Sequence, residues 1–312
     1  MLLGKQVTEM ENIIIVGAGP AGISAALYAA RGNMNPLVIN TGIGSLEKAE
    51  KIENYYGLEE PLSGRELFER GISQAREMGV RILDAQVVGM GGFDTFVVKT
   101  TEGDHEAVSV ILATGNKRAT VRIPGIREFE GKGVSYCAVC DAFFYRGKEV
   151  AVLGNSDFAL HEAEELSHIA SHVTIFTDGK EPDFSKENSF DVNTMKIQAI
   201  EGEERVSGIR LEGDMTAQEA GEEISSFEPA DGVFVALGTA GSSEMARQIG
   251  AELTDKGNIR VNENMETTVP GLYAAGDCTG GLLQVAKAVH DGAQAGLSAV
   301  QYVRKVLKEQ QK

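Results

Sequence analysis

The sequence predicts an α/β fold with two domains, and three features support this expectation. Residues 12–16 form an apolar β-branched run, followed by a glycine-rich turn, a helical pattern and a second strand-like run at 36–39. A similar strand, turn, helix and strand begins at residue 149 and ends at about residue 177. The length of 312 residues also suits about two domains. Both repeats are βαβ units, which are typical of parallel sheets.

The rest of the sequence predicts further helices and strands and a C-terminal segment that belongs to the first domain. A helical pattern covers residues 64–78, and strands are expected near residues 80–83, 95–100, 108–112, 206–211 and 233–237. Residues 178–193 are polar and are expected to form a loop. The glycine-rich segment from residue 271 and the helical pattern at 283–309 are too short for a separate domain. We therefore expect them to pack against the first βαβ unit.

This packing makes the first domain discontinuous. It would comprise residues 1–117 and 243–312, with residues 118–242 as the inserted second domain. The connections would lie near residues 115–120 and 238–242, where glycine offers the dihedral freedom of a hinge.

Composition excludes several classes of protein. The chain has 29 Lys and Arg against 46 Asp and Glu, a net charge of −17, so its long-range field repels nucleic acid and anionic membranes. No run approaches the roughly 20 apolar residues of a membrane span. The first residues lack the apolar core of a secretory signal. We expect a cytoplasmic protein.

The first glycine-rich turn predicts a dinucleotide site. Its glycines follow the G-x-G-x-x-G spacing at Gly17, Gly19 and Gly22, between a strand and a helix. The first permits a sharp turn, the second lets a pyrophosphate approach the backbone, and the third packs helix on strand. The fold class is therefore Rossmann-like, of the three-layer ββα type, in both domains. Asn40 ends the second strand, where an acidic residue would bind an NAD ribose.

Cys137 and Cys140 form a CxxC motif, which predicts a redox-active disulfide. Zinc would need two further ligands, and the third cysteine, Cys278, has no CxxC partner, so no metal site is expected. One thiolate of a CxxC pair can attack a partner disulfide while the other resolves the mixed disulfide. The adjacent Asp141 could hold or donate the proton that this exchange requires. Cys278 is expected to be a buried inert thiol.

Several motifs together resemble the low-molecular-weight thioredoxin reductases over nearly the whole chain. They are VGAGPAG at 16–22, NTG at 40–42, IEN at 52–54, ATG at 113–115, SYCAVCDAFFYRGKEVAVLG from Ser135, GLYAAGDC from Gly271 and QVAKA from Gln284. The resemblance implies a homodimer with FAD as cofactor and thioredoxin as substrate. It also implies that Cys140 faces the flavin, Cys137 attacks thioredoxin and Asp141 is the acid.

The same resemblance implies a set of FAD-binding residues. They are Gly17, Ala18, Gly19, Pro20, Ala21, Asn40, Thr41, Asn54, Thr114, Gly115, Gly276, Asp277 and Gln284.

The second glycine-rich turn departs from this family. NADPH-dependent members need a turn open to pyrophosphate and a basic run for the 2′-phosphate, but this chain has Ser156 in the turn and Asp178 after the next strand. The departure resembles the ferredoxin-dependent flavin thioredoxin reductases, which lack the pyridine-nucleotide signature. Electrons would pass from reduced ferredoxin to FAD, to the Cys137/Cys140 disulfide and to thioredoxin, with rotation of the inserted domain between steps.

Three alternatives remain open from the residues. Asp178 could bind the ribose diol of NADH, the CxxC motif could serve a dithiol oxidase that uses oxygen, or the chain could be a non-catalytic flavin sensor. Residues 116–148 contain seven basic and three acidic residues, which could dock an acidic partner.

Overall fold

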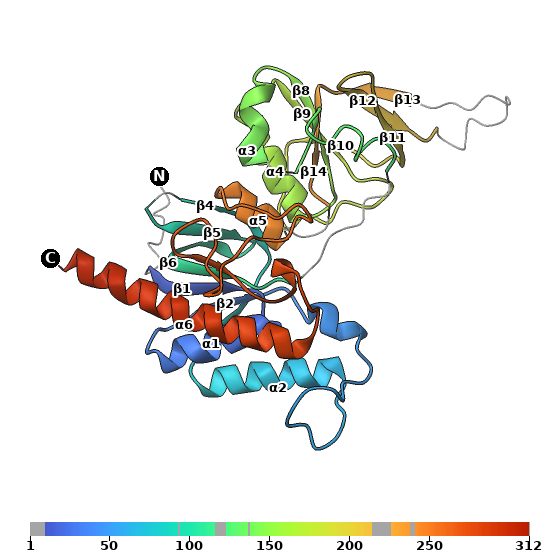
Figure 1. Ribbon diagram of the computed structural model, residues 1–312. Helices are drawn as coiled ribbons and strands as arrows, with labels where there is room; N and C mark the ends of the chain where they lie inside the picture. The colour runs from blue at the N-terminus through green and yellow to red at the C-terminus, as the bar shows by residue number, and fades with distance from the viewer. Residues whose placement is uncertain are drawn as a thin grey trace. The chain divides into compact units, whose positions relative to one another are not determined.

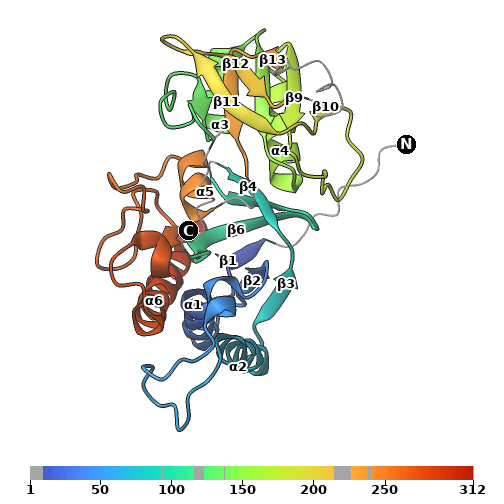
Figure 2. The same cartoon turned by 90° about the vertical axis from the view of Figure 1, so that its right-hand side faces the viewer.

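The computed structural model describes residues 10–92, 94–115, 123–136, 138–213, 226–237 and 241–311 (Figures 1 and 2). The chain forms two compact units. Unit 1 comprises Met1–Lys117 and Gly241–Lys312, and unit 2 comprises Arg118–Ala240. The α/β class predicted from the sequence is confirmed, since both units contain parallel sheets.

Unit 1 is built on a seven-stranded sheet with the order β3-β2-β1-β6-β5-β4, in which β15 also pairs with β6. Strands β1, β2, β3, β6 and β15 pair in parallel, whereas β4 and β5 are antiparallel. Ile13, Ile14 and Ile15 of β1 are completely buried, as expected for a central strand covered on both faces. The strands are β1 (Glu11–Val16), β2 (Leu37–Asn40), β3 (Arg81–Asp84), β4 (Val87–Gly91), β5 (Phe96–Thr100), β6 (Gly103–Leu112) and β15 (Leu272–Ala274).

The C-terminal helix of unit 1 packs along its first helix (Figure 1). Glycine makes the close approach feasible: a Cβ on Gly292 would lie 2.0 Å from Ala21 O, and one on Gly296 would lie 2.6 Å from Ala25 O. Both ends of the chain therefore build one unit. Its helices are α1 (Pro20–Arg31), η1 (Gly44–Lys48), α2 (Gly64–Glu77), α5 (Ser242–Gln248), η4 (Gly276–Thr279) and α6 (Val285–Gln310).

Unit 2 contains a five-stranded sheet with the order β10-β9-β8-β14-β7 and an antiparallel sheet with the order β11-β12-β13. Their shared core includes Leu153, Val233, Ile209 and Leu211. The strands are β7 (Val134–Ser135), β8 (Glu149–Leu153), β9 (His172–Phe176), β10 (Asp191–Asn193), β11 (Ile197–Gly202), β12 (Val206–Leu211), β13 (Ser226–Pro229) and β14 (Gly232–Val235). The helices are α3 (Ala138–Asp141), η2 (Ala142–Tyr145) and α4 (Asp157–Ser167).

The structure corrects one expectation about elements and leaves another outside its range. Residues 178–193 are not entirely a loop, because Asp191–Asn193 pair with β9 as the short parallel strand β10. A strand of three residues, of which only Val192 is apolar, is too short to show a sequence periodicity, so only this pairing reveals the strand. Most of the expected hinge residues, 116–120 and 238–240, lie outside the described residues. Among the helices that are described, none is both long and apolar enough to cross a membrane.

Candidate flavin site and redox motif

The first glycine-rich turn has the geometry of a phosphate-binding backbone. Gly17 has φ +107°, and its Cβ would lie 2.5 Å from Ala113 O, while a Cβ on Gly22 would lie 1.8 Å from Gly17 O. At Gly19, by contrast, a Cβ would meet nothing within 4 Å. Gly19 is extended and immediately precedes α1. The first and third glycines are therefore required by packing, and the second leaves the helix N-terminus open to an anionic group.

Asn40 lies beside a carboxylate, Asp84, that the sequence reasoning missed. The Asn40 side-chain amide donates a hydrogen bond to Asp84 Oδ1 at 2.7 Å, and Asn40 Oδ1 accepts the Gly42 N–H at 3.0 Å. Asn40 and Asp84 end the neighbouring strands β2 and β3 in register. The acidic group expected at the end of β2 is thus present at the end of β3, one strand away. Asp84 could have been found from the sequence, because the carboxyl ends of neighbouring parallel strands meet at the same edge of a sheet.

A second turn approaches the start of α1 from the C-terminal part of the chain. Gly276 has φ +83°, and a Cβ there would lie 2.9 Å from the Ala21 side chain. Asp277 follows in the 3-10 turn η4. Burial raises the pKa of its carboxyl, and this shift is opposed by the Lys287 cation and reinforced by Asp291. Residues about 255 positions apart are therefore neighbours in unit 1.

Two further pairs join distant segments of unit 1. The Asn54 amide donates to Gln284 Oε1 at 3.0 Å. Thr114 and Ser242 are joined by hydrogen bonds. Their hydroxyl oxygens lie 2.6 Å apart, and the Ser242 N–H donates to Thr114 Oγ1 at 3.1 Å. Ser242 was missed by the sequence reasoning, since nothing in the motif at 113–115 points to a partner so far along the chain.

The other residues expected at the flavin site also lie in unit 1. Ala18 and Ala21 are buried, Thr41 is exposed, Pro20 is the first residue of α1 and Gly115 has φ +75°.

The CxxC motif is only partly within the described residues. Cys137 lies outside them, and of Cys140 only the backbone, in α3, is described. The completely buried Ala138 donates its backbone N–H to Glu162 Oε2 at 2.6 Å. Glu162 belongs to α4 and is only 1% exposed. A buried carboxylate therefore fixes the backbone between the two cysteines.

Asp141 is held on the other side of the motif. The Ser135 hydroxyl donates to Asp141 Oδ2 at 2.6 Å. Ser135 is buried at the end of β7, whereas Asp141 is half-buried. The sequence reasoning missed both Ser135 and Glu162 as partners of the motif.

Two aromatic side chains project from the turn that follows Asp141. Phe143 and Phe144 of η2 are 69% and 67% exposed and meet edge to face at 6.2 Å. The Arg146 guanidinium lies 5.6 Å from the centre of the Phe143 ring. Exposed aromatic pairs beside a cation are typical of protein-binding surfaces.

The second glycine-rich turn is covered by the chain itself. Asn155 O accepts the Asp183 N–H at 2.6 Å, and the Asn155 amide donates to Glu181 O at 3.0 Å. Asp157, the first residue of α4, accepts the Ser185 N–H through Oδ1 at 2.8 Å. We call residues 181–185 the covering segment. It lies against the turn and the first residue of the helix, where a nucleotide pyrophosphate would have to bind.

The Asp178 carboxylate is also engaged. Its Oδ1 accepts the Lys196 ammonium at 2.8 Å and the Ile197 N–H at 3.0 Å. This carboxylate links the end of β9 to the start of β11.

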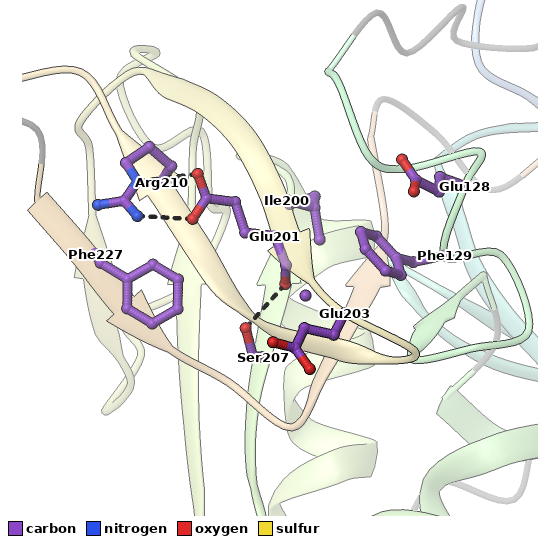
Figure 3. Close-up of a pocket in the computed structure, with 9 residues that line it drawn as sticks. Glu128, Phe129, Ile200, Glu201, Glu203, Ser207, Arg210 and Phe227 are labelled. Atoms are coloured by element: carbon purple, nitrogen blue, oxygen red, sulfur yellow. Dashed lines mark hydrogen bonds and ion pairs between the residues drawn. The ribbon is translucent and has the colours of Figure 1, made fainter.

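A groove of about 470 Å³ lies elsewhere in unit 2 (Figure 3). Glu201 and Arg210 are paired there by two hydrogen bonds of 3.0 and 2.7 Å, and Arg210 lies over the Phe227 ring. Because the only arginine of the lining is held by Glu201, and Glu128 and Glu203 add negative charge, the groove is unsuited to a phosphate.

Cys278 is a buried thiol in unit 1. Its single S–H has two carbonyl acceptors within reach, Ala275 O at 3.3 Å and Leu112 O at 3.5 Å. Burial raises its pKa to about 11. The thiolate, which is the reactive form, is therefore scarce at neutral pH. Within the described part of the chain, no three His, Cys, Asp or Glu side chains gather as a metal site.

Comparison with known proteins identifies the family. Residues 11–292 match the family model described as pyridine nucleotide-disulphide oxidoreductase. The chain belongs to this family. It is 34% identical over 313 residues to a thioredoxin reductase of Bacillus subtilis, covering 96% of each protein.

Two solved structures are also similar. The atypical thioredoxin reductase TRi from Desulfovibrio vulgaris Hildenborough has 39% identity and a TM-score of 0.86, covering 95% of this chain and 99% of that one. A ferredoxin-flavin thioredoxin reductase from Clostridium acetobutylicum has 31% identity and a TM-score of 0.66, with the same coverage.

The cofactor of this family member is FAD. The residues present fit it, because the start of α1 has no side-chain cap, the approach at Gly19 is open where a side chain would intrude, and the Gly276 turn lies directly against Ala21.

Proposed function

We propose that this chain is a thioredoxin reductase that takes its electrons from reduced ferredoxin and passes them through FAD and the Cys137/Cys140 disulfide to thioredoxin. Its similarity to the thioredoxin reductases supports the reaction. The covering segment on the second glycine-rich turn supports a protein donor. The similar protein from Clostridium acetobutylicum is a ferredoxin-flavin thioredoxin reductase.

The donor assignment rests on how the second turn is occupied. A pyridine nucleotide needs the backbone N–H groups at the start of a helix for its pyrophosphate. In this chain Asp157 places a carboxylate at that position and holds the Ser185 N–H with it. A nucleotide would therefore have to displace the covering segment and approach a negative charge.

The NADH alternative is weakened for a related reason. Asp178 accepts hydrogen bonds from the Lys196 ammonium and the Ile197 N–H, both through Oδ1. Its negative charge is therefore already paired with Lys196, and the carboxylate is held toward the start of β11, with Oδ2 as the oxygen that a ribose diol could meet.

The proposed reaction gives FAD and each residue of the CxxC motif a separate role. FAD supplies the ability to accept electrons one at a time and to deliver them as a pair. Two electrons and two protons convert the Cys137/Cys140 disulfide to two thiols. The Cys137 thiolate then attacks the disulfide of thioredoxin, and Cys140 attacks the mixed disulfide, so thioredoxin leaves as the dithiol. Asp141, oriented by Ser135, holds or donates the proton that the departing thiolate takes up.

We assign thioredoxin docking to the exposed Phe143 and Phe144 pair. The pair directly follows the redox motif, and Arg146 adds a positive charge beside it. Of the basic residues in the positive segment 116–148, Lys117, Arg118 and Arg122 lie outside the described residues.

By the same family resemblance we propose a homodimer that works in the cytoplasm, where thiols are kept reduced.

One anaerobic experiment tests the donor. The purified yellow protein is mixed with NADPH, NADH or reduced ferredoxin, and flavin bleaching and thioredoxin thiols are followed. We expect bleaching and thiol formation with ferredoxin alone. Rapid bleaching by micromolar NADPH or NADH would overturn the assignment. In a separate aerobic assay, oxygen consumption with a small dithiol but no thioredoxin reduction would identify a dithiol oxidase.

A further inference from the structure

We propose that Lys287 is a positioning residue for FAD: its pairing with Asp291 fixes the turn at residues 276–280 against the start of α1. The inference rests on FAD as cofactor and not on the identity of the electron donor. Lys287 lies in the first turn of α6, and its side chain is 21% exposed.

The Lys287 ammonium gathers the polar groups of one turn. It donates to Gly276 O at 2.8 Å, to Thr279 Oγ1 at 2.8 Å and to Gly280 O at 2.7 Å. An ammonium has three N–H donors, so these three acceptors already match its capacity. The cation therefore links the first residue of the turn, Gly276, to Thr279 and Gly280 at its end.

Asp291 completes the arrangement from the next turn of α6. Its Oδ2 lies 2.7 Å from the Lys287 ammonium and accepts the Gly276 N–H at 3.1 Å. Asp291 is almost fully buried, and His290 Nδ1 lies 3.4 Å from its Oδ1. Gly276 is thus held at both its N–H and its carbonyl. A buried ion pair of this kind is weak as a source of stability but strong as a geometric constraint.

The turn also has hydrogen bonds of its own: the Thr279 hydroxyl donates to Gly276 O at 2.8 Å, and the Gly280 N–H donates to Asp277 O at 3.0 Å. Gly276 and Gly280 both have positive φ, +83° and +79°, so the backbone enters and leaves η4 in conformations that side chains disfavour. Without Lys287, the Gly276 carbonyl would keep the Thr279 hydroxyl as a donor, but the Gly280 carbonyl and the buried Asp291 carboxylate would lose the cation. We expect the turn to move rather than to keep these two groups without it.

Movement of the turn would alter the flavin site. Gly276 lies against Ala21, and Asp277, the adjacent residue, is one of the expected FAD ligands. Burial raises the pKa of Asp277, and the Lys287 cation lowers it. The cation therefore favours the ionised carboxylate of Asp277, the form that accepts hydrogen bonds from hydroxyl groups. Lys287 therefore acts on the position and the charge of the group that meets the cofactor.

The test measures FAD retention and does not use turnover. Holoprotein carrying Lys287→Met is diluted, and the fluorescence of released FAD gives its Kd. We expect FAD binding at least about tenfold weaker than in the wild type. The matched control is Lys308→Met, which removes an exposed lysine from the last turn of the same helix and should leave the Kd unchanged.

Two measurements separate positioning from general stability. The rise of Tm on addition of excess FAD reports binding, and we expect this rise to shrink in Lys287→Met. Lys287→Gln keeps an amide donor in case the methionine variant does not fold, and we expect it to bind FAD at least threefold more weakly. The proposal is wrong if the foldable variants retain the wild-type Kd, or if their Tm falls while the FAD-induced rise is unchanged.

Discussion

The Glu162 carboxylate in α4 accepts the backbone N–H of Ala138 at 2.6 Å, and Ala138 is the residue that follows Cys137. Both residues are buried. The helix that follows the second glycine-rich turn therefore holds the backbone of the redox motif. The second turn is covered by the chain's own residues, and α4 contacts the CxxC motif through this hydrogen bond.

The first prediction concerns this hydrogen bond. Glu162→Ala leaves the Ala138 N–H without its acceptor in a buried site, which costs about 1–3 kcal/mol of unfolding free energy. Glu162→Gln keeps an amide oxygen and should lose less stability and less of the rate of thioredoxin reduction. Thermal unfolding and steady-state rates measure both. Glu164→Gln, at a half-buried surface ion pair of the same helix, is the control. Equal effects of the alanine and glutamine variants would contradict this role.

The second prediction concerns the acid. Asp141→Asn removes the carboxyl that handles the proton, so thioredoxin reduction should fall by about 10²–10⁴-fold. Ser135→Ala keeps the carboxyl but removes the 2.6 Å hydrogen bond that orients it, and a smaller loss is expected. Rates are compared with Tm values to separate chemistry from folding. Wild-type activity in Asp141→Asn would remove this residue from the mechanism.

The third prediction concerns docking. Phe143→Ala and Phe144→Ala should each raise the KM for thioredoxin by about tenfold, the size of a contact worth more than 1 kcal/mol at an interface. Flavin reduction by the donor should be unaffected. Phe227→Ala, a partly exposed phenylalanine elsewhere in unit 2, should leave this KM unchanged. A docking surface elsewhere would be indicated if both η2 variants kept the wild-type KM.

The fourth prediction concerns pH. Burial raises the pKa of the Cys278 thiol in the folded protein to about 11, from its ordinary value of 9.0. Its contribution to stability is therefore fully present below about pH 9 and is lost as the pH rises toward 11. Cys278→Ala should show a smaller fall of unfolding free energy across this window in denaturant titrations. At pH 8 the wild-type thiol should resist alkylation until the protein unfolds, and rapid labelling of the folded protein would contradict its burial.

Much of the fold could be predicted because its signals are local. The apolar run at 12–16, the glycine spacing from Gly17 and the helical pattern at 64–78 correspond to β1, the open turn and α2. The CxxC motif and Asp141, which we propose as its acid, are adjacent in the chain, so their chemistry could be proposed without coordinates. Strand β12 was predicted at residues 206–211, but its partners β11 and β13 and the short strand β10 were not, because such strands form only when a partner strand is present.

The amino-acid sequence by itself determined the family, the α/β class and the cofactor, since each depends on residues a few positions apart whose spacing has a direct steric meaning. Tertiary structure decided which distant groups meet: Asp84 beside Asn40, Glu162 on Ala138, the covering segment on Asp157, and Lys287 beneath the turn at Gly276. These pairings depend on strand register and on helix packing. No local pattern encodes them, because side chains separated by many residues become neighbours only when the core between them has formed.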